Sequence, residues 1–304
     1  MIIQGDALEQ LKKLSDESVD CVVTSPPYWA LRDYGVEGQL GLEPTFQEYI
    51  TKLCNIFDEV KRVLKKSGTC WVNMGDTYGG TGSGQKDTGK HGYTPEAMAT
   101  TKNKPQSKLQ GKSLIQIPSR FAIEMTNRGW ILRNEIIWYK PNGMPSSAKD
   151  RFTVDFEKVF FFVKSKKYWF ETQYEPYTED LDRWGGEKLK ADGESTWDEG
   201  TGQDTYRDRN MRPNSNGRNK RCVWRINTKP FKEAHFAVYP EKLIEPMIKA
   251  GCPEDGVVLD PFFGAGTTAV VAQKLNRKWL GIELNPEYIE IAEERLKNIQ
   301  QTLI

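Results

Sequence analysis

Apolar residues recur along the chain with two different periods, which together predict alternating strands and helices. Between residues 46 and 64 they follow the spacing of one helical face, at Phe46, Tyr49, Ile50, Leu53, Ile56, Phe57, Val60, Val63 and Leu64. Lys65, Lys66 and Gly68 then supply the positive charge and the stop that are typical of a helix C-terminus. Short apolar runs predict buried strands at 19–24, 70–75, 130–140 and 157–165, and a helix is expected near 118–128.

The C-terminal part of the chain shows the clearest alternation. It predicts a strand at 257–259, a helix at 267–276, a strand at 279–284 and a helix from Pro286 to about Gln300. Strands that alternate with helices and are apolar throughout indicate a parallel sheet covered on both faces. The expected fold class is therefore α/β, with a mostly parallel sheet and helices on both faces.

Two long segments show neither period. Residues 79–113 are polar and rich in glycine, and residues 172–229 look like an insertion or a separate small lobe. Loops of this length are usually functional or disordered rather than simple connections. We therefore expect a mobile loop at 79–113 and an inserted region ahead of the C-terminal elements.

The composition indicates a soluble, cytoplasmic globular protein. With 304 residues, 38% hydrophobic and 28% charged, the chain can bury one large core or two modest ones. No apolar run approaches the roughly 20 residues that span a bilayer, and the N-terminus lacks the basic region and cleavage-like site of an export signal. Five scattered cysteines without a Cys-x-x-Cys pair fit reduced thiols, and the presence of only two histidines argues against a metal site.

The net charge of +1 hides two blocks of opposite charge. Residues 171–204 carry eleven acidic and three basic side chains, and residues 205–232 carry nine basic and one acidic. The basic block contains Arg207, Arg209, Arg212, Arg218, Lys220, Arg221 and Arg225. Such a density of positive charge favours a polyanionic partner. A solvated loop balanced by its acidic neighbour is the alternative.

A glycine turn near the C-terminus indicates a ligand site. In VVLDPFFGAGTTAVVAQKL, Gly264 and Gly266 lie between a strand and a helix, where backbone can approach a ligand closely. Glu283 ends the next strand, where a carboxylate can accept hydrogen bonds from both ribose hydroxyls. The third glycine of a dinucleotide fingerprint is missing, and Asp260 ahead of the turn repels pyrophosphate but suits an ammonium group. The ligand inferred is an adenosine with an amino-acid tail; a purely structural glycine turn is the alternative.

A second motif lies far upstream, and the two together carry a family likeness. TSPPYW (residues 24–29) follows an apolar strand, and LDPFFGAGTT follows another near the C-terminus. In this order they resemble the permuted β-class of DNA amino-methyltransferases, the cytosine-N4 and adenine-N6 enzymes that use S-adenosyl-L-methionine (SAM). The resemblance implies a Rossmann-like SAM-dependent methyltransferase fold with an inserted DNA-recognition region. It divides the chain into a catalytic domain at 1–166 and 233–304 and a target-recognition region at 167–232.

The resemblance also implies partners and residue roles. DNA is the expected substrate, and a cognate restriction endonuclease in the same host is the expected further partner. The enzyme is expected to be a monomer or homodimer of bacterial, archaeal or phage origin. The residues that match the family's cofactor site are Asp260, Phe262, Gly264, Gly266, Thr267 and Thr268 around the methionine part, Glu283 at the ribose and Asp6 at the adenine. His235 and Tyr239, with Pro240, match the segment that closes the cofactor pocket. An ordinary turn is the alternative for Asp6, and capping or packing for His235.

The chemistry of TSPPYW supports this interpretation independently. An exocyclic amine is a poor nucleophile because its lone pair is delocalised into the ring. Two acceptors on its hydrogens favour a pyramidal nitrogen, and Ser25 Oγ and the Pro26 carbonyl, aimed by the fixed φ angles of Pro26 and Pro27, can provide them. Tyr28 can stack on a base taken out of the duplex, and Trp29 either extends that wall or packs under the loop.

The target base and the substrate class stay open at this point. Serine at the first position resembles enzymes that methylate cytosine N4, but Ser-Pro-Pro-Tyr also occurs in adenine-N6 enzymes. Enzymes that methylate RNA or protein glutamine can use a similar Pro-Pro-Tyr motif, and a non-catalytic nucleic-acid binder is a third possibility. The basic block, with Trp224 and Phe231 interleaved, is the candidate for DNA contact. The lysine-containing segment 79–113 is expected to become ordered on DNA.

Overall fold

The computed structural model describes residues 1–79, 111–177, 216–229 and 238–302. The chain divides into two compact units, one formed by Met1–Glu171 with Cys222–Ile304 and the other by Thr172–Arg221. The recognition region predicted at 167–232 encloses the second unit. The first unit contains both motifs.

The first unit is built on one eight-stranded sheet with the order β1-β10-β9-β2-β3-β5-β4-β8. In this order the strands are Ile2–Gln4, Lys278–Glu283, Val257–Asp260, Val19–Thr24, Leu64–Met74, Phe156–Val163, Ile131–Tyr139 and Val223–Arg225. The first five strands in this order, β1, β10, β9, β2 and β3, are parallel to one another. β5 is antiparallel to both of its neighbours, and β8 is parallel to β4. The predicted mostly parallel sheet is confirmed.

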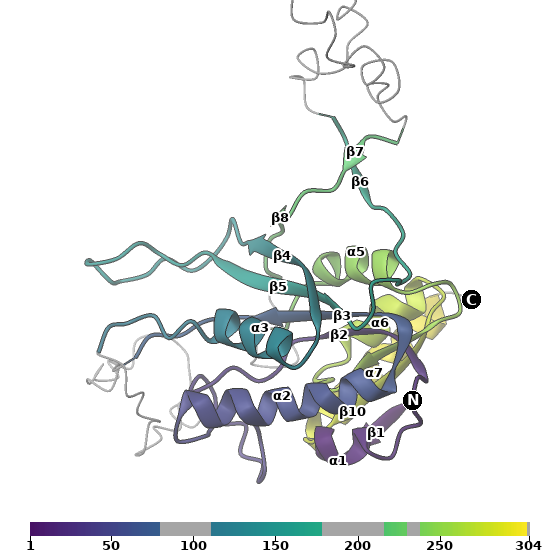
Figure 1. Cartoon of the computed structure of the whole chain (residues 1–304), viewed down its shortest axis with the longest axis horizontal. Coiled ribbons are helices and arrows are strands. Elements are labelled where there is room, and N and C mark those ends of the chain that lie inside the picture. Colours follow the sequence, from purple (N-terminus) through teal and green to yellow (C-terminus); the bar gives the residue numbers. More distant parts are fainter. Residues whose placement is uncertain (80–110, 178–215, 230–237, 303–304) are drawn as a thin grey trace, which may run out of the picture. The chain divides into compact units, whose positions relative to one another are not determined.

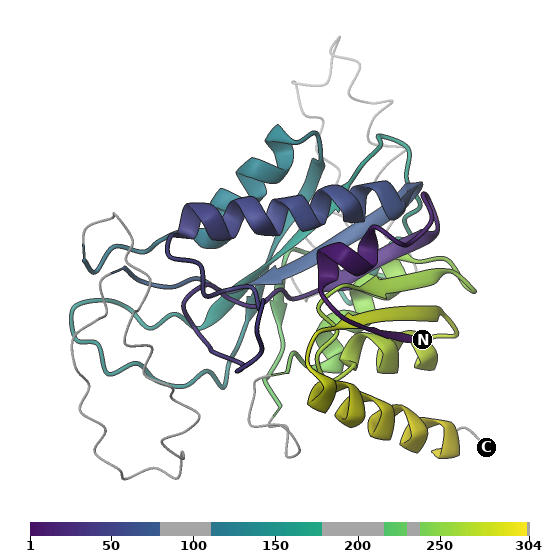
Figure 2. The same cartoon turned by 90° about the horizontal axis from the view of Figure 1, so that it is seen from below.

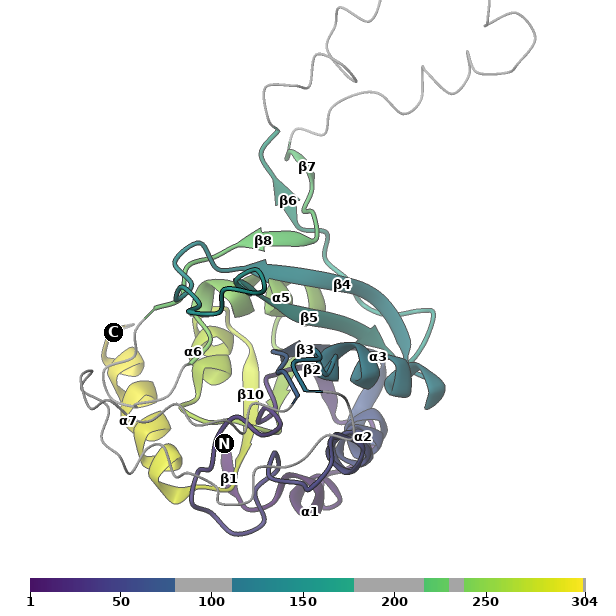
Figure 3. The same cartoon turned by 90° about the vertical axis from the view of Figure 1, so that its left-hand side faces the viewer.

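Helices cover both faces of this sheet, as predicted (Figure 3). They are α1 (Ala7–Leu11), α2 (Phe46–Val63), α3 (Ile117–Asn127), α5 (Glu241–Gly251), α6 (Thr267–Lys274) and α7 (Pro286–Thr302). The buried residues of α1, α2 and α3 form one core with one side of the sheet, and those of α5, with Val271 and Ala272 of α6, form another with the opposite side; the remaining buried apolar residues of α6 pack with α7. In β3 the pleat sends Cys70 and Val72 to the first core and Trp71 to the second. Figures 1 and 2 show α2 lying along the sheet.

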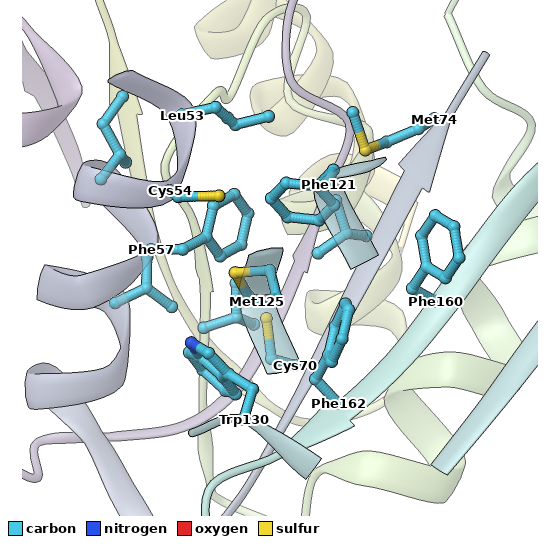
Figure 4. Close-up of a cluster of buried hydrophobic side chains, with 14 of the residues drawn as sticks. Leu53, Cys54, Phe57, Cys70, Met74, Phe121, Met125, Trp130, Phe160 and Phe162 are labelled. Atoms are coloured by element: carbon cyan, nitrogen blue, oxygen red, sulfur yellow. The ribbon is translucent and has the colours of Figure 1, made fainter. Parts of the chain in front are cut away.

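An aromatic cluster anchors α2 and α3 to the sheet (Figure 4). Phe121 of α3 contacts Phe57 of α2 with ring centroids 5.2 Å apart and Phe162 of β5 with centroids 6.1 Å apart, both edge-on. These rings are fully buried, and edge-to-face pairs add to the free energy of burial. The cluster therefore holds α2, which follows the first motif, and α3, which follows β3, in a defined position on the sheet.

Most of the predicted helices and strands are confirmed, and one boundary is wrong. The strand predicted to start at residue 70 starts at Leu64, directly after α2, so residues 65–68 belong to β3. Leu64 is already extended, with φ −71° and ψ 134°. The strand starts early because Leu64 pairs with Val19 of β2. β1, α1, α5, β6, β7 and β8 were not predicted, and apart from α5 these elements are too short for a period to be visible. In the described part of the chain, no helix is long and apolar enough to cross a membrane.

The second unit contributes a two-stranded antiparallel ribbon of β6 (Tyr174–Glu175) and β7 (Arg218–Asn219). Glu175 accepts hydrogen bonds from the side chains of Arg218 (2.9 Å) and Arg221 (2.6 Å). Two of the predicted DNA-contacting arginines are therefore paired with a carboxylate at the base of this ribbon. Residues 178–215, which include Arg207, Arg209 and Arg212, lie outside the described residues.

Candidate active site

The two motifs meet at one cavity of about 710 Å³. Its walls include Ser25, Pro26 and Tyr28 from the exit of β2 and Gly264 and Glu283 from the exits of β9 and β10. They meet because β9 pairs directly with β2, with Val22 opposite Leu259, so that the carboxyl ends of both strands lie at the same edge. A cavity of this size suits a small organic ligand.

Asp260, at the end of β9, holds three segments together from behind the cavity wall. It is fully buried, and its oxygens accept hydrogen bonds from Thr24 Oγ1 (2.6 Å), Thr268 Oγ1 (2.7 Å), Tyr239 OH (2.9 Å) and the Phe262 N–H (3.1 Å). Burial raises the pKa of this carboxyl, although all four donors oppose the shift. Neither Asp260 nor Thr268 lines the cavity. Their polar atoms join β2, β9 and α6, so these two residues support the cavity from behind, and the direct cofactor contacts expected of them stay a prediction.

The glycine turn and Glu283 form a bridge on the cavity surface. Gly264 and Gly266 have φ of 51° and 75°, the left-handed region that favours glycine. The Gly264 N–H donates to Glu283 Oε2 (2.7 Å), and the Asn285 N–H donates to Glu283 Oε1 (2.8 Å). Burial raises the pKa of Glu283, with these backbone donors opposing it. Glu283 lines the cavity, and because a carboxylate oxygen can accept more than one hydrogen bond, it can also accept from two ribose hydroxyls.

The remaining predicted cofactor residues differ in their position. Phe262, Thr267, Tyr239 and Asp6 line the cavity, whereas Gly266 starts α6 behind it. Asp6 is also the N-cap of α1, because its carboxylate accepts a hydrogen bond from the Glu9 N–H (3.0 Å). It therefore has a structural role in the turn and also lines the cavity. His235 lies outside the described residues.

The carbonyls of the two prolines have different partners. Tyr49 of α2 donates its hydroxyl hydrogen to the Pro27 carbonyl (2.8 Å). No described residue donates a hydrogen bond to the Pro26 carbonyl, and Pro26 lines the cavity. Ser25 Oγ has only long contacts, to Asn73 Oδ1 (3.4 Å) and Tyr28 OH (3.5 Å). The two acceptors predicted for the amine are thus the ones whose hydrogen-bonding capacity is least used.

Tyr28 is clamped from its hydroxyl and from one ring edge. Its OH donates to Glu157 Oε2 (2.7 Å), and burial together with the Glu157 charge raises its pKa well above the usual value. A Cβ atom at Gly75 would lie 2.6 Å from the Tyr28 ring, so only glycine leaves room for the ring there. Glu157 also pairs with Lys140, whose Nζ lies 4.4 Å from the centroid of the Trp138 ring. The ring therefore has one orientation in which to receive a base.

Sequence reasoning missed four residues around the TSPPYW motif: Tyr49, Asn73, Lys140 and Glu157. Asn73 was detectable as a buried polar residue inside the apolar run of β3. Lys140 and Glu157 flank the β4–β5 connection as an ordinary charged pair, and Tyr49 fits its helical face as a core residue. Only the pairing of β3 with β5 and of β5 with β4 brings these side chains beside Tyr28.

Trp29 belongs to the core and not to the DNA-contacting surface. It is 3% exposed, its indole N–H donates to the Glu43 carbonyl (3.0 Å), and its ring meets Phe46 edge-on with centroids 6.1 Å apart. The structure therefore supports the packing alternative and corrects the assignment of Trp29 to DNA binding. Lys220 is in the second unit, and Arg225 ends β8 with an exposed side chain.

Comparison with known proteins gives this site a family. The family described as DNA methylase matches residues 19–294 of the chain, which include both motifs. The chain belongs to this family. The match confirms the resemblance to the N6 and N4 amino-methyltransferases, and the protein is a DNA methyltransferase of that type.

Full-length relatives support the same assignment. The Type II methyltransferase M.Cfr9I of Citrobacter freundii is 42% identical over 303 residues, covering 100% of this chain and 89% of the relative. M.SmaI of Serratia marcescens is also 42% identical, over 97% of this chain and 90% of its own length.

Two solved structures share the Rossmann-like methyltransferase fold. The PvuII DNA methyltransferase (cytosine-N4-specific) has a TM-score of 0.62 at 22% identity, covering 96% of this chain and 84% of that one. The M1.HpyAVI–SAM complex has a TM-score of 0.57 at 18% identity, covering 97% and 98%. At such identities they establish the fold of this chain.

Proposed function

We propose that the protein transfers a methyl group from SAM to the exocyclic amine of an extruded DNA base, and that this base is cytosine, methylated at N4. The observation that carries the proposal is the meeting of two halves at one cavity. Glu283 and Gly264 line one part of it, and Ser25, Pro26 and Tyr28 line another. A methyl donor and its acceptor have to share one site in this way.

The cofactor end suits an adenosine with an amino-acid tail. Glu283 presents two carboxylate oxygens, each with one backbone donor, to the cavity. Nothing lies within 4 Å of the Cβ position of Gly264, which leaves space for a ligand against the turn. Asp6 and Glu283 make this end acidic, which disfavours phosphate groups and accepts an ammonium group. Asp260 supports this end indirectly by fixing the exits of β2 and β9.

The reactive end polarises the amine without a nucleophilic side chain. SAM, when bound, supplies a methyl group on a sulfonium that is a strong leaving group. Ser25 Oγ and the Pro26 carbonyl accept the two amine hydrogens and so direct the nitrogen lone pair. The nitrogen–carbon bond forms as the carbon–sulfur bond breaks, and the product amine releases one proton to solvent. Tyr28, held by Glu157, supplies the surface on which the extruded base stacks.

The choice of cytosine N4 rests on Ser25. A serine ahead of Pro-Pro-Tyr resembles the cytosine-N4 enzymes, whereas adenine N6 presents the same two hydrogens and is the alternative. The relatives named as Type II methyltransferases favour a role in restriction and modification, with a cognate endonuclease in the same host.

Labelled-methyl transfer to unmethylated bacterial DNA, followed by mass spectrometry of the nucleosides, tests the proposal. N4-methylcytosine is the expected product, and the Ser25→Ala variant serves as the matched control. N6-methyladenine would overturn the cytosine assignment and keep the reaction. Label only in RNA or in protein glutamine, or a failure to bind SAM, would overturn the reaction itself. Sequencing the modified DNA then identifies the recognition site.

A further inference from the structure

The connection between β4 and β5, residues 140–155, leaves the sheet at the same edge as the active site. β4 and β3 are both antiparallel to β5, so β4 ends where β3 ends. The Lys140 N–H donates to the Asp155 carbonyl (2.8 Å) and closes the stem of this hairpin. Figure 1 shows the hairpin extending past the ends of the strands. We call residues 140–155 the β4–β5 hairpin.

The two most exposed large apolar side chains among the described residues both lie in this hairpin. Phe152 is 96% exposed and Met144 is 82% exposed. A single exposed apolar residue is ordinary on a protein surface. An almost fully exposed phenylalanine together with a similarly exposed methionine in one short hairpin is a concentration that usually marks an interaction site.

The base of the hairpin is part of the active site. Lys140, the first residue of the hairpin, lines the cavity together with Trp138 of β4 and Glu157 of β5, on the Tyr28 side. Higher up, Asp150 pairs with Lys112 (2.8 Å), and the Arg151 guanidinium lies 3.6 Å from the centroid of the Tyr78 ring. These contacts tie the hairpin to the segments that follow β3 and precede α3. The apolar side chains therefore belong to a hairpin that is held to its neighbours and whose base lines the cavity.

We propose that Phe152 and Met144 enter the base stack of duplex DNA at the gap left by the extruded base. The inference rests on the proposed function, because only chemistry on an extruded base creates such a gap. Apolar side chains inserted between base steps are an established way to stabilise opened duplex. Lys149, exposed in the same hairpin, is placed to neutralise a flanking phosphate. Duplex DNA is the one partner that explains apolar and basic side chains together at this edge.

The test compares two duplexes that carry the recognition site identified as above. In one, the target base is normally paired; in the other, an abasic site lies opposite it, so that extrusion costs little. The variants are Phe152→Ala, Met144→Ala and their combination. Ile123→Ala is the matched control, because Ile123 is 62% exposed on α3 and does not line the cavity. Single-turnover methylation, SAM affinity and thermal unfolding are measured for each.

We expect the combined variant to methylate the paired duplex about tenfold more slowly than the wild type, because a lost wedge leaves part of the unstacking energy uncompensated. On the abasic duplex its rate should recover to within about twofold of the wild type, with SAM affinity, unfolding temperature and the Ile123→Ala control unchanged. An equal loss on both duplexes, or no loss on either, overturns the inference. If the wild type methylates neither duplex, the proposed function fails, whatever the variants do.

Discussion

The two halves of the cavity are built in different ways. In the cofactor half, Asp260 and Glu283 accept six hydrogen bonds of 2.6–3.1 Å, three of them from backbone N–H groups. In the reactive half, Ser25 Oγ has contacts of only 3.4 and 3.5 Å, and the Pro26 carbonyl accepts from no described residue. In one half the carboxylates are held by several short hydrogen bonds, and in the other the acceptors keep most of their capacity for a substrate.

This difference separates stability from turnover. The carboxylates of the cofactor half, Asp260 buried and Glu283 partly buried, are part of the connections between segments, so changing them has to disturb the fold as well as the ligand. Ser25 contributes little to folding because its present contacts are weak, and its acceptor capacity becomes useful only when an amine arrives. Substitutions in the two halves should therefore affect different measurements.

The largest effect is expected for Asp260→Ala. It leaves the Thr24, Tyr239 and Thr268 hydroxyls and one backbone N–H without their acceptor, so the free energy of unfolding should fall by about 4 kcal/mol. Chemical denaturation of the cofactor-free protein measures this. Asp260→Asn, which keeps one acceptor oxygen and the shape, should lose about half as much. A variant as stable as the wild type, with only SAM binding lost, would contradict the supporting role.

Ser25→Ala should act on the reaction alone. We expect turnover to fall about 10²-fold, as for the loss of one positioned polar partner of a transition state, with unchanged SAM affinity and unfolding free energy. Steady-state kinetics and calorimetric SAM titration check the two parts. Ser18→Ala, which removes an exposed hydroxyl that is bonded only locally, is the control. Normal turnover in Ser25→Ala would remove Ser25 from the mechanism.

Glu283 makes the cofactor half sensitive to pH. Because burial raises its pKa, the carboxylate gains a proton as the pH falls through that raised value, and SAM affinity should fall with it. The effect of the same group on folding has the opposite sign. The folded state holds this proton more tightly than the unfolded state, so its contribution to stability grows as the pH falls.

The Glu283→Gln variant tests whether Glu283 causes this pH dependence. We expect SAM to bind about 20-fold more weakly at neutral pH, since a charged acceptor is lost, and the pH dependence of affinity to flatten. SAM titrations at several pH values measure both. An unchanged pH dependence in this variant would assign the titration to another group.

Tyr28→Phe and Glu157→Gln probe the clamp that joins the reactive half to β5. Each should lower turnover about tenfold, because the ring stays but its orientation is no longer fixed by a charged acceptor. Since both changes break the same hydrogen bond, the double variant should lose little more than either single variant. Turnover and KM for DNA are measured for the wild type, the two single variants and the double variant, which together form a double-mutant cycle. Losses that multiply would show that Tyr28 and Glu157 act separately.

Local pattern was sufficient for the regular part of the protein. The helical period in 46–64 and the apolar runs of β2, β9 and β10 predicted their elements, because burial alone determines those residues. The two motifs were also legible locally, since a glycine turn and a double proline have backbone requirements of their own. The sequence by itself therefore determined the α/β class, the two ends of the site and the family.

Only the tertiary structure decided what each side chain does there. The pairing of β9 with β2 placed Asp260 behind the cavity as a buried acceptor that joins strand ends, and the packing of Trp29 against Phe46 removed it from the DNA-facing set. The hairpin of β4 and β5 brought Lys140 and Glu157 to Tyr28, more than 100 residues away in sequence. Such contacts depend on strand order and register, which no local pattern encodes, because period and composition are the same whichever strands become neighbours.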